Sequence, residues 1–210
     1  MTDQLKTGTT TVGIACKDGI VLAADMRATA GTMIVDKTAD KVHILSDDFA
    51  VTWAGTVSDA QLLTRLAKAE LKLKEVRTSK RPTTKEAANL IAGLLYSSIR
   101  RPSMFPAIAH FLLAGKDVDG THLYDLFPDG SVTLIKDYVS SGSGSVFAYG
   151  VLETQYGKNM GVDDGVKLAV KAVNTALQRD SASGNGINVV VVTSKDIKKV
   201  MHKEVAMSLL

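Results

Sequence analysis

Short turn signals divide this sequence into hairpin-linked strands, and no other feature constrains its fold as strongly. Gly19 closes the connection between two β-rich runs, at residues 9–16 and 20–25, and suits a turn with positive φ. The remaining predicted strands are 41–45, 49–55, 108–115, 121–127, 131–140, 187–193 and 199–203. Because connections this short join antiparallel neighbours, we expect antiparallel sheets rather than parallel ones.

Pairs of helices interrupt the strands. Capping-box patterns predict helix starts at Ser58, with Gln61, and at Thr83, with Glu86. The face expected to be buried in the first helix consists of Leu62, Leu63, Leu66, Ala69 and Leu73. A second pair is expected at about 145–156 and 163–180. The order ββββ, αα, βββ, αα, ββ predicts an α+β domain, with two stacked antiparallel sheets between two helical layers.

Composition argues against several classes of function. The 210 residues suit one domain, expected at 9–210 after a short polar tail at 1–8. A net charge of +3 without a basic stripe argues against a nucleic-acid partner. No apolar run approaches the roughly 18 residues of a membrane span, and the N-terminus lacks the apolar stretch of a secretory signal. The one cysteine, Cys16, has no internal disulfide partner and suits a small apolar strand position. We therefore expect a cytoplasmic location without membrane contact.

Common metal and cofactor motifs fail on spacing. The Gly-Lys pairs at Gly115 and Gly157 lack the upstream glycine of a P-loop, and Gly142 to Gly144 lacks the third glycine of a dinucleotide fingerprint. No G-x-S-x-G elbow occurs. The histidines fall on separate predicted strands without metal-ligand spacing, at His43, His110, His122 and His202. We therefore expect neither a metal nor a cofactor.

Thr9 is the candidate nucleophile, because it follows a short tail and a glycine. A threonine freed at a chain terminus carries its own base, since its α-amino group has a pKa of roughly 8. That amine can take the hydroxyl proton near neutral pH and so activate the alcohol. Gly8 has no Cβ, which leaves its carbonyl open to attack by the Thr9 hydroxyl, and this attack would remove the tail. Thr10 and Thr11 need no function, since threonine is common on strands.

Several short motifs, taken together in order and spacing, resemble those of archaeal proteasome β subunits. They are residues 9–14, Asp25-Met26-Arg27, Lys41, Ala54-Gly55, 142–145 followed by 149–153, and 178–184. The resemblance runs from about Leu5 to the final strand. It implies the N-terminal-nucleophile hydrolase fold, a four-layer αββα sandwich, in agreement with the order of elements above. The eight-residue tail resembles the short archaeal pro-segment, with Gly8 and Thr9 at the processing site.

The resemblance also implies catalytic roles. Thr9 would be the nucleophile and, once freed, the amine base. Lys41 would lie beside its hydroxyl, lowering the hydroxyl pKa and stabilising developing charge, and Asp25 would hold Lys41 in place and keep it charged. The backbone N–H of Gly55 would be the oxyanion donor. The residues that would orient the amine and its water are Ser143, Asp180 and Ser183. Without the family, these positions suit strand ends and turns.

The substrate pocket implied by the resemblance is lined by Ala28, Ala39, His43, Trp53 and Val57. Trp53 is bulkier than the residue usually found at the pocket floor in this family. We therefore expect a graded preference for small or medium apolar substrate side chains over large aromatic ones. Without the family, Trp53 is interpreted as an ordinary core aromatic residue.

The resemblance therefore implies a threonine endopeptidase that degrades unfolded proteins after autocatalytic removal of residues 1–8. The chain with its tail attached would be an inactive precursor. The implied partners are α subunits and other β subunits in stacked heptameric rings, and a separate ATP-dependent unfoldase ring. Three alternatives stay open: a non-catalytic ring subunit, a hydrolase of the same fold acting on a small amide, and a nucleotide-binding protein. The presence of Thr9, Lys41 and Asp25 argues against the non-catalytic subunit. The size of the particle in solution would test the small-amide hydrolase. The absence of the required glycine spacing disfavours the nucleotide-binding protein.

Overall fold

The computed structural model describes residues 8–104 and 107–204. Its elements are β1 (Thr11–Cys16), β2 (Gly19–Asp25), β3 (Ala28–Ala30), β4 (Met33–Asp36), β5 (Val42–Ile44), β6 (Phe49–Gly55), α1 (Val57–Thr78), α2 (Thr84–Ile99), β7 (Ala109–Asp117), β8 (Gly120–Leu126), β9 (Val132–Ile135), β10 (Tyr138–Ser141), α3 (Ser145–Gln155), α4 (Val162–Leu177), β11 (Gly186–Thr193) and β12 (Ile197–Glu204).

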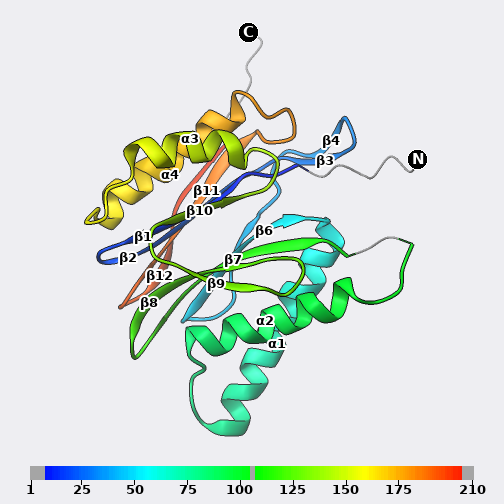
Figure 1. The fold of residues 1–210 in the computed structure, drawn as a ribbon, viewed down its shortest axis with the longest axis vertical. Helices are drawn as coiled ribbons and strands as arrows, with labels where there is room; N and C mark the ends of the chain where they lie inside the picture. Colours follow the sequence, from blue (N-terminus) through cyan, green and yellow to red (C-terminus); the bar gives the residue numbers. More distant parts are fainter. Residues whose placement is uncertain (1–7, 105–106, 205–210) are drawn as a thin grey trace.

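Two antiparallel sheets stack face to face between two layers of helices (Figure 1). One five-stranded sheet has the order β10-β1-β2-β11-β12 and is covered by α3 and α4. The other has the order β5-β6-β7-β8-β9 and is covered by α1 and α2. Separate clusters of buried apolar residues fill the space beneath each helix pair and the space between the sheets. The predicted four-layer αββα sandwich is confirmed.

The first hairpin forms as predicted, but Gly19 plays a different part from the one expected. It pairs with Cys16 inside the ladder, so the turn consists of Lys17 and Asp18, and the φ angle of Gly19 is not positive. A Cβ at this position would lie 2.5 Å from the Val192 carbonyl oxygen in β11. Glycine is therefore required by the close approach of the neighbouring strand and not by the turn.

The structure contains more strands than the sequence predicted, in two places. The single strand expected at 131–140 is split into β9, which pairs with β8, and β10, which pairs with β1. This segment carries the chain from one sheet to the other, so it belongs to both. The small β3–β4 hairpin was not expected from the sequence, and it forms a two-stranded sheet of its own.

The start of α2 follows the prediction, whereas the start and buried face of α1 do not. The Thr83 hydroxyl accepts a hydrogen bond from the Glu86 backbone N–H, and the Glu86 carboxylate accepts one from the Thr83 N–H. Helix α1 instead begins at Val57, after an N-cap at Thr56 whose side chain makes no capping bond. Its buried face consists of Ala60, Leu63, Ala67 and Leu71, and the exposed positions include Leu62, Leu66 and Leu73. Small alanines form half of the true contact stripe, so leucine spacing alone indicated the wrong face.

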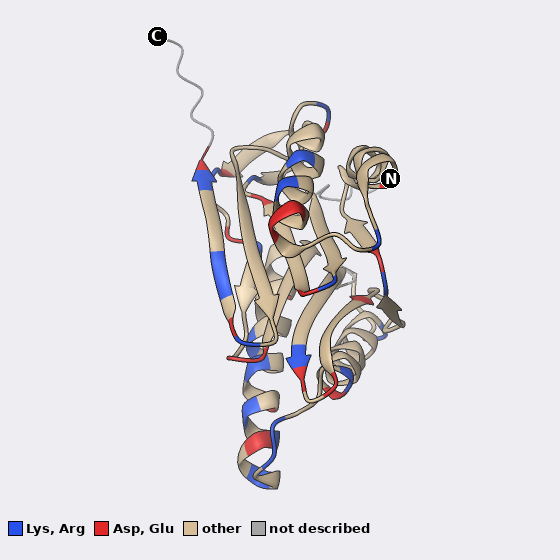
Figure 2. Cartoon of the chain, turned by 90° about the vertical axis from the view of Figure 1, so that its left-hand side faces the viewer, with Lys and Arg blue, Asp and Glu red and all other residues tan. Residues whose placement is uncertain are grey.

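Charged side chains of both signs lie on several elements of the surface (Figure 2). Lysines mark the exposed face of β12 and much of α1, with acidic residues nearby. Within the described residues, no helix combines the length and apolar character that crossing a membrane requires.

Candidate active site

Thr9 lies two residues before the start of β1, at the end of the sheet, and is 3% exposed. Its Oγ1 donates a hydrogen bond to the carbonyl oxygen of Gly8 over 2.6 Å. Its backbone N–H donates to the Ser143 hydroxyl over 3.2 Å, and its carbonyl accepts from the Gly144 N–H over 3.4 Å. The segment between β10 and α3 therefore fixes the backbone of Thr9, while the side chain points at the bond that precedes it.

Lys41 and Asp25 form an ion pair beside this bond. The Nζ of Lys41 lies 2.7 Å from Oδ1 of Asp25 and 3.4 Å from the carbonyl oxygen of Gly8. Burial lowers the pKa of the Lys41 ammonium below its ordinary value, because a low-polarity environment disfavours the charged form, and the neighbouring Asp25 opposes this shift. The hydroxyl of Thr9 and the amine of Lys41 thus converge on the same carbonyl oxygen.

The Asp25 carboxylate is held by four donors. Its Oδ1 accepts from Lys41 and from the backbone N–H of Thr10, and its Oδ2 accepts from the backbone N–H groups of Arg27 and Gly184. These hydrogen bonds offset the desolvation cost of burying the carboxylate. Asp25 therefore ties the end of β2 to Lys41 and to the loop after α4.

Ser143, Asp180 and Ser183 form a second, connected group. Both serine hydroxyls donate to Oδ2 of Asp180, over 2.6 Å from Ser143 and 2.7 Å from Ser183. Ser143 links this group to the nitrogen of Thr9. The structure thus brings together all six residues for which the family resemblance implied catalytic side-chain roles. The two that are farthest apart in the sequence, Thr9 and Ser183, are separated by 174 positions.

Three residues to which the sequence assigned no catalytic role complete the site. Thr10 was interpreted as an ordinary strand residue. Its hydroxyl is hydrogen-bonded to the hydroxyl of Ser183 over 2.7 Å. The Thr29 hydroxyl accepts from the Gly8 N–H over 3.2 Å. The Arg27 guanidinium donates to the Ser181 carbonyl and so holds the loop that carries the acidic group. The run of three threonines was the only signal for Thr10, and nothing local indicated Thr29.

Close packing leaves no room for a side chain at Gly8. A Cβ at this position would lie 1.7 Å from the Cβ of Ala182, a distance at which two carbon atoms cannot coexist. Any larger residue would therefore push the Asp180–Ser183 segment away from Thr9. The rest of the expected pro-segment, residues 1–7, lies outside the described residues.

Gly55 ends β6 in a conformation that favours glycine. Its φ is +121°, and a Cβ there would lie 2.2 Å from the Ile108 carbonyl oxygen. Within the described part of the chain, Gly55 stands outside the hydrogen-bonded network around Thr9. Its role as oxyanion donor stays a prediction.

Comparison with known proteins agrees with this geometry. The family model described as "Proteasome subunit" matches residues 5–192. A protein named "Proteasome subunit beta" from Ferroglobus placidus is 44% identical over 203 residues, covering 97% of this chain and 95% of that one. Proteins of the same name from Archaeoglobus fulgidus and Methanocaldococcus vulcanius are 43% and 42% identical, again over 97% of this chain and over 93% and 89% of theirs. This chain belongs to the proteasome β-subunit family.

Membership of the β-subunit family carries peptidase activity with it, and it confirms the resemblance seen in the sequence. The matches give no support to the small-amide hydrolase or to the nucleotide-binding protein. In the described residues, no cluster of three or more His, Cys, Asp or Glu side chains is placed to hold a metal ion.

Three of the residues expected to line the substrate pocket of this β subunit lie together. The rings of His43 and Trp53 stack with centroids 6.1 Å apart and planes 6° apart, and Val57 packs against the same apolar cluster as Trp53. Burial lowers the pKa of His43 below its ordinary value. Ala28 lies at the start of β3, and Ala39 donates from its backbone to the carbonyl of Met26, so both belong to the strand-connecting segment beyond β2. The lining of one pocket by all five stays a prediction.

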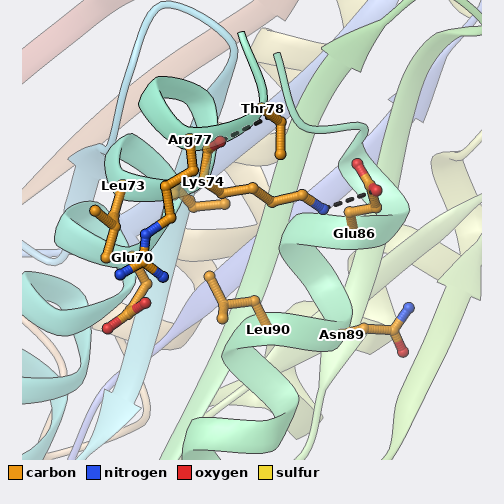
Figure 3. Close-up of a pocket in the computed structure, with 9 residues that line it drawn as sticks. Glu70, Leu73, Lys74, Arg77, Thr78, Glu86, Asn89 and Leu90 are labelled. Carbon is orange, nitrogen blue, oxygen red and sulfur yellow. Dashed lines mark hydrogen bonds and ion pairs between the residues drawn. The ribbon is translucent and has the colours of Figure 1, made fainter. Parts of the chain in front are cut away.

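A cavity of about 560 Å³ lies elsewhere, between α1 and α2 (Figure 3). The Lys74–Glu86 ion pair spans it, with Leu90 below (Figure 3). Its lining residues all come from α1 and α2, and none of them takes part in the hydrogen bonds around Thr9. It is therefore separate from the network around Thr9.

Proposed function

We propose that this proteasome β subunit is a threonine-type endopeptidase whose nucleophile is the hydroxyl of Thr9. The observation that carries the proposal is the convergence of the Thr9 hydroxyl and the Lys41 amine on the carbonyl oxygen of Gly8. In this reading residues 1–8 are a pro-segment, and residues 9–210 are the mature catalytic domain.

Removal of the tail follows from this placement. The Thr9 oxygen attacks the Gly8 carbonyl carbon and gives up its proton, and the C–N bond to Thr9 breaks as its nitrogen gains a proton. The product is an ester between Gly8 and the Thr9 oxygen, together with a free α-amino group. Water then hydrolyses the ester, which releases the tail as a carboxylate and restores the hydroxyl. Lys41 supports the step from 3.4 Å by stabilising charge that develops on the carbonyl oxygen.

Cleavage of a substrate peptide bond repeats this chemistry with one difference, because the free amine of Thr9 now acts as the base. Ser143, which contacts the Thr9 nitrogen, orients that amine, with Asp180 and Ser183 behind it. The N–H of Gly55 stabilises the oxyanion of the tetrahedral intermediate. Substrate first acylates the Thr9 oxygen, and water then releases the acyl group.

The chain with Gly8 attached is inactive in this account. The Thr9 nitrogen is then an amide, which has no basic lone pair, so the general base does not exist. This arrangement protects the cell, since an unassembled subunit with an open site would attack other proteins. Activation follows assembly, when the site becomes enclosed in a chamber.

The proposed partners follow from the family. We expect assembly with α subunits and further β subunits in stacked heptameric rings, in the cytoplasm. Unfolded proteins are the expected substrates, delivered by a separate ATP-dependent unfoldase ring. Neither nucleic acid nor a membrane is an expected partner.

The test replaces the nucleophile in particles assembled with the α subunit. Thr9→Ala should assemble but neither lose its tail nor cleave fluorogenic peptides, and Thr9→Ser should retain part of both activities. Thr11→Ala is the matched control, since Thr11 is a buried threonine two residues further along the chain, at the start of β1, and lies outside the proposed machinery. Normal peptide cleavage by an assembled Thr9→Ala particle would contradict the proposal.

A further inference from the structure

A hydrogen-bonded cluster joins the two stacked sheets beside the candidate active site. The Ser141 hydroxyl, at the end of β10, lies 2.7 Å from Nδ1 of His110 in β7. The other ring nitrogen, Nε2, is hydrogen-bonded to the carboxylate of Asp125 in β8. Ser141 thus belongs to the sheet that carries Thr9, and the other two residues belong to the sheet that carries Gly55.

The carboxylate fixes the direction of one of these bonds. A carboxylate can only accept, so Nε2 of His110 carries a proton and donates a hydrogen bond to Asp125. When the ring is neutral, Nδ1 is an acceptor, and the Ser141 hydroxyl donates a hydrogen bond to it. The Phe127 ring packs on the imidazole with centroids 4.4 Å apart, and Ser141 is buried. Shielding from water strengthens such a network.

Each end of this link lies next to a segment of the catalytic machinery. Ser141 is two residues before Ser143, whose hydroxyl accepts from the Thr9 N–H. His110 pairs with Ala54 in the sheet register, and Ala54 directly precedes Gly55. Among the described residues, Ser141–His110 is the one side-chain hydrogen bond that directly joins strands of the two five-stranded sheets. It therefore connects the half of the site that holds the nucleophile with the half that holds the expected oxyanion donor.

We propose that Ser141, His110 and Asp125 are positioning residues that hold the Gly55 N–H at the separation from Thr9 that the tetrahedral intermediate requires. The inference rests on the proposed function, because the role of Gly55 as oxyanion donor is part of that proposal. A misplacement of about 1 Å between reacting groups can cost on the order of 100-fold in rate. Loss of the link therefore lowers kcat, whereas binding of the unreacted substrate and KM stay nearly unchanged.

The test uses processed particles assembled with the α subunit, with kcat expressed per chain shown by intact mass to begin at Thr9. Ser141→Ala should lower kcat roughly 10- to 100-fold and leave KM within about twofold. Ser140→Ala is the matched control, because its buried hydroxyl donates to the Thr11 carbonyl within a single sheet. It should keep kcat near the wild-type value. Ser141→Thr keeps the hydroxyl on a strand position and should restore most of the rate.

A second readout separates positioning from general stability. A peptide boronate becomes tetrahedral when its boron accepts the Thr9 oxygen, so its affinity depends on the oxyanion donor. Its inhibition constant should rise in Ser141→Ala by the factor by which kcat/KM falls. The dissociation constant of the same peptide without an electrophile should not change.

The outcomes distinguish this inference from the function on which it rests. Activity in the Thr9→Ala particle would overturn both. An inactive Thr9→Ala particle together with an unchanged kcat in Ser141→Ala would overturn the positioning role alone. If Ser141→Ala does not assemble, the Asp125→Ala variant, which removes the acceptor of the His110 Nε2–H bond, should show the same loss of kcat at constant KM. Failure of both to assemble, with Ser140→Ala intact, would assign the cluster to folding and contradict the proposal.

Discussion

The Nζ of Lys41 lies 2.7 Å from Oδ1 of Asp25, and the two side chains are 1% and 0% exposed. An ion pair this deeply buried gives weak evidence for stability, since desolvation offsets much of the attraction. Breaking it by removing one partner leaves an uncompensated charge, which typically costs about 3–5 kcal/mol. The pair therefore fits the proposed chemistry at the adjacent Gly8 carbonyl.

Lys41→Ala should lower the peptidase rate of the assembled particle by about 100-fold or more, because it removes one preorganised charge from an enclosed site. Lys74→Ala is the control, since Lys74 forms an ion pair with Glu86 on the surface, where such pairs are worth about 0–1 kcal/mol. Turnover should be measured per assembled chain for both variants. Near-normal turnover in Lys41→Ala would contradict a catalytic role for this lysine and indicate a structural one.

Trp53→Ala should shift cleavage preference toward large aromatic side chains. Trp53 is 3% exposed and stacked on His43, so its removal opens volume where the family resemblance places the pocket floor. The gain should be graded, since a methylene-sized mismatch is worth roughly 1–3 kcal/mol. A panel of fluorogenic peptides that differ in one side chain measures it. If the variant gains nothing on aromatic substrates, the steric argument fails.

Cys16 should be nearly inert toward alkylating reagents in the folded chain. Burial, reinforced by the charge of Asp18, raises the pKa of its thiol from 9.0 to about 12. At pH 8.5 the thiolate fraction then falls more than the higher intrinsic nucleophilicity compensates, so alkylation should be on the order of tens-fold slower than in denaturant. Mass spectrometry after timed iodoacetamide treatment checks this, and equal rates in both states would contradict it.

Elements of the fold that depend on neighbouring residues in the sequence were predictable. Turn residues and apolar runs indicated most strands, and the capping box at Thr83 placed α2 correctly. Patterns failed where tertiary contacts decide. In α1 the sheet packs against Leu63 and small alanines, while Leu62 on the adjacent face is 49% exposed.

The same distinction holds for the site. Thr9 stands out in the sequence through Gly8 and the short tail, but its link to Lys41 depends on a fold that brings positions 32 residues apart together. Only the family resemblance indicated that link. Thr29 and the Ser141–His110 bond have no local signal at all, since serine and threonine are ordinary strand residues.

In the proposed mechanism, the peptide bond before Thr9 is the first bond that this chain cleaves, and its cleavage frees the amine that acts as the base in every later reaction. The most direct measurement follows the intact mass and the peptidase activity of the purified chain, alone and after addition of α rings. We expect the mass to fall by that of Met1–Gly8, and peptidase activity to appear, only after assembly. Full peptidase activity in the isolated chain with Met1 still attached would contradict this mechanism.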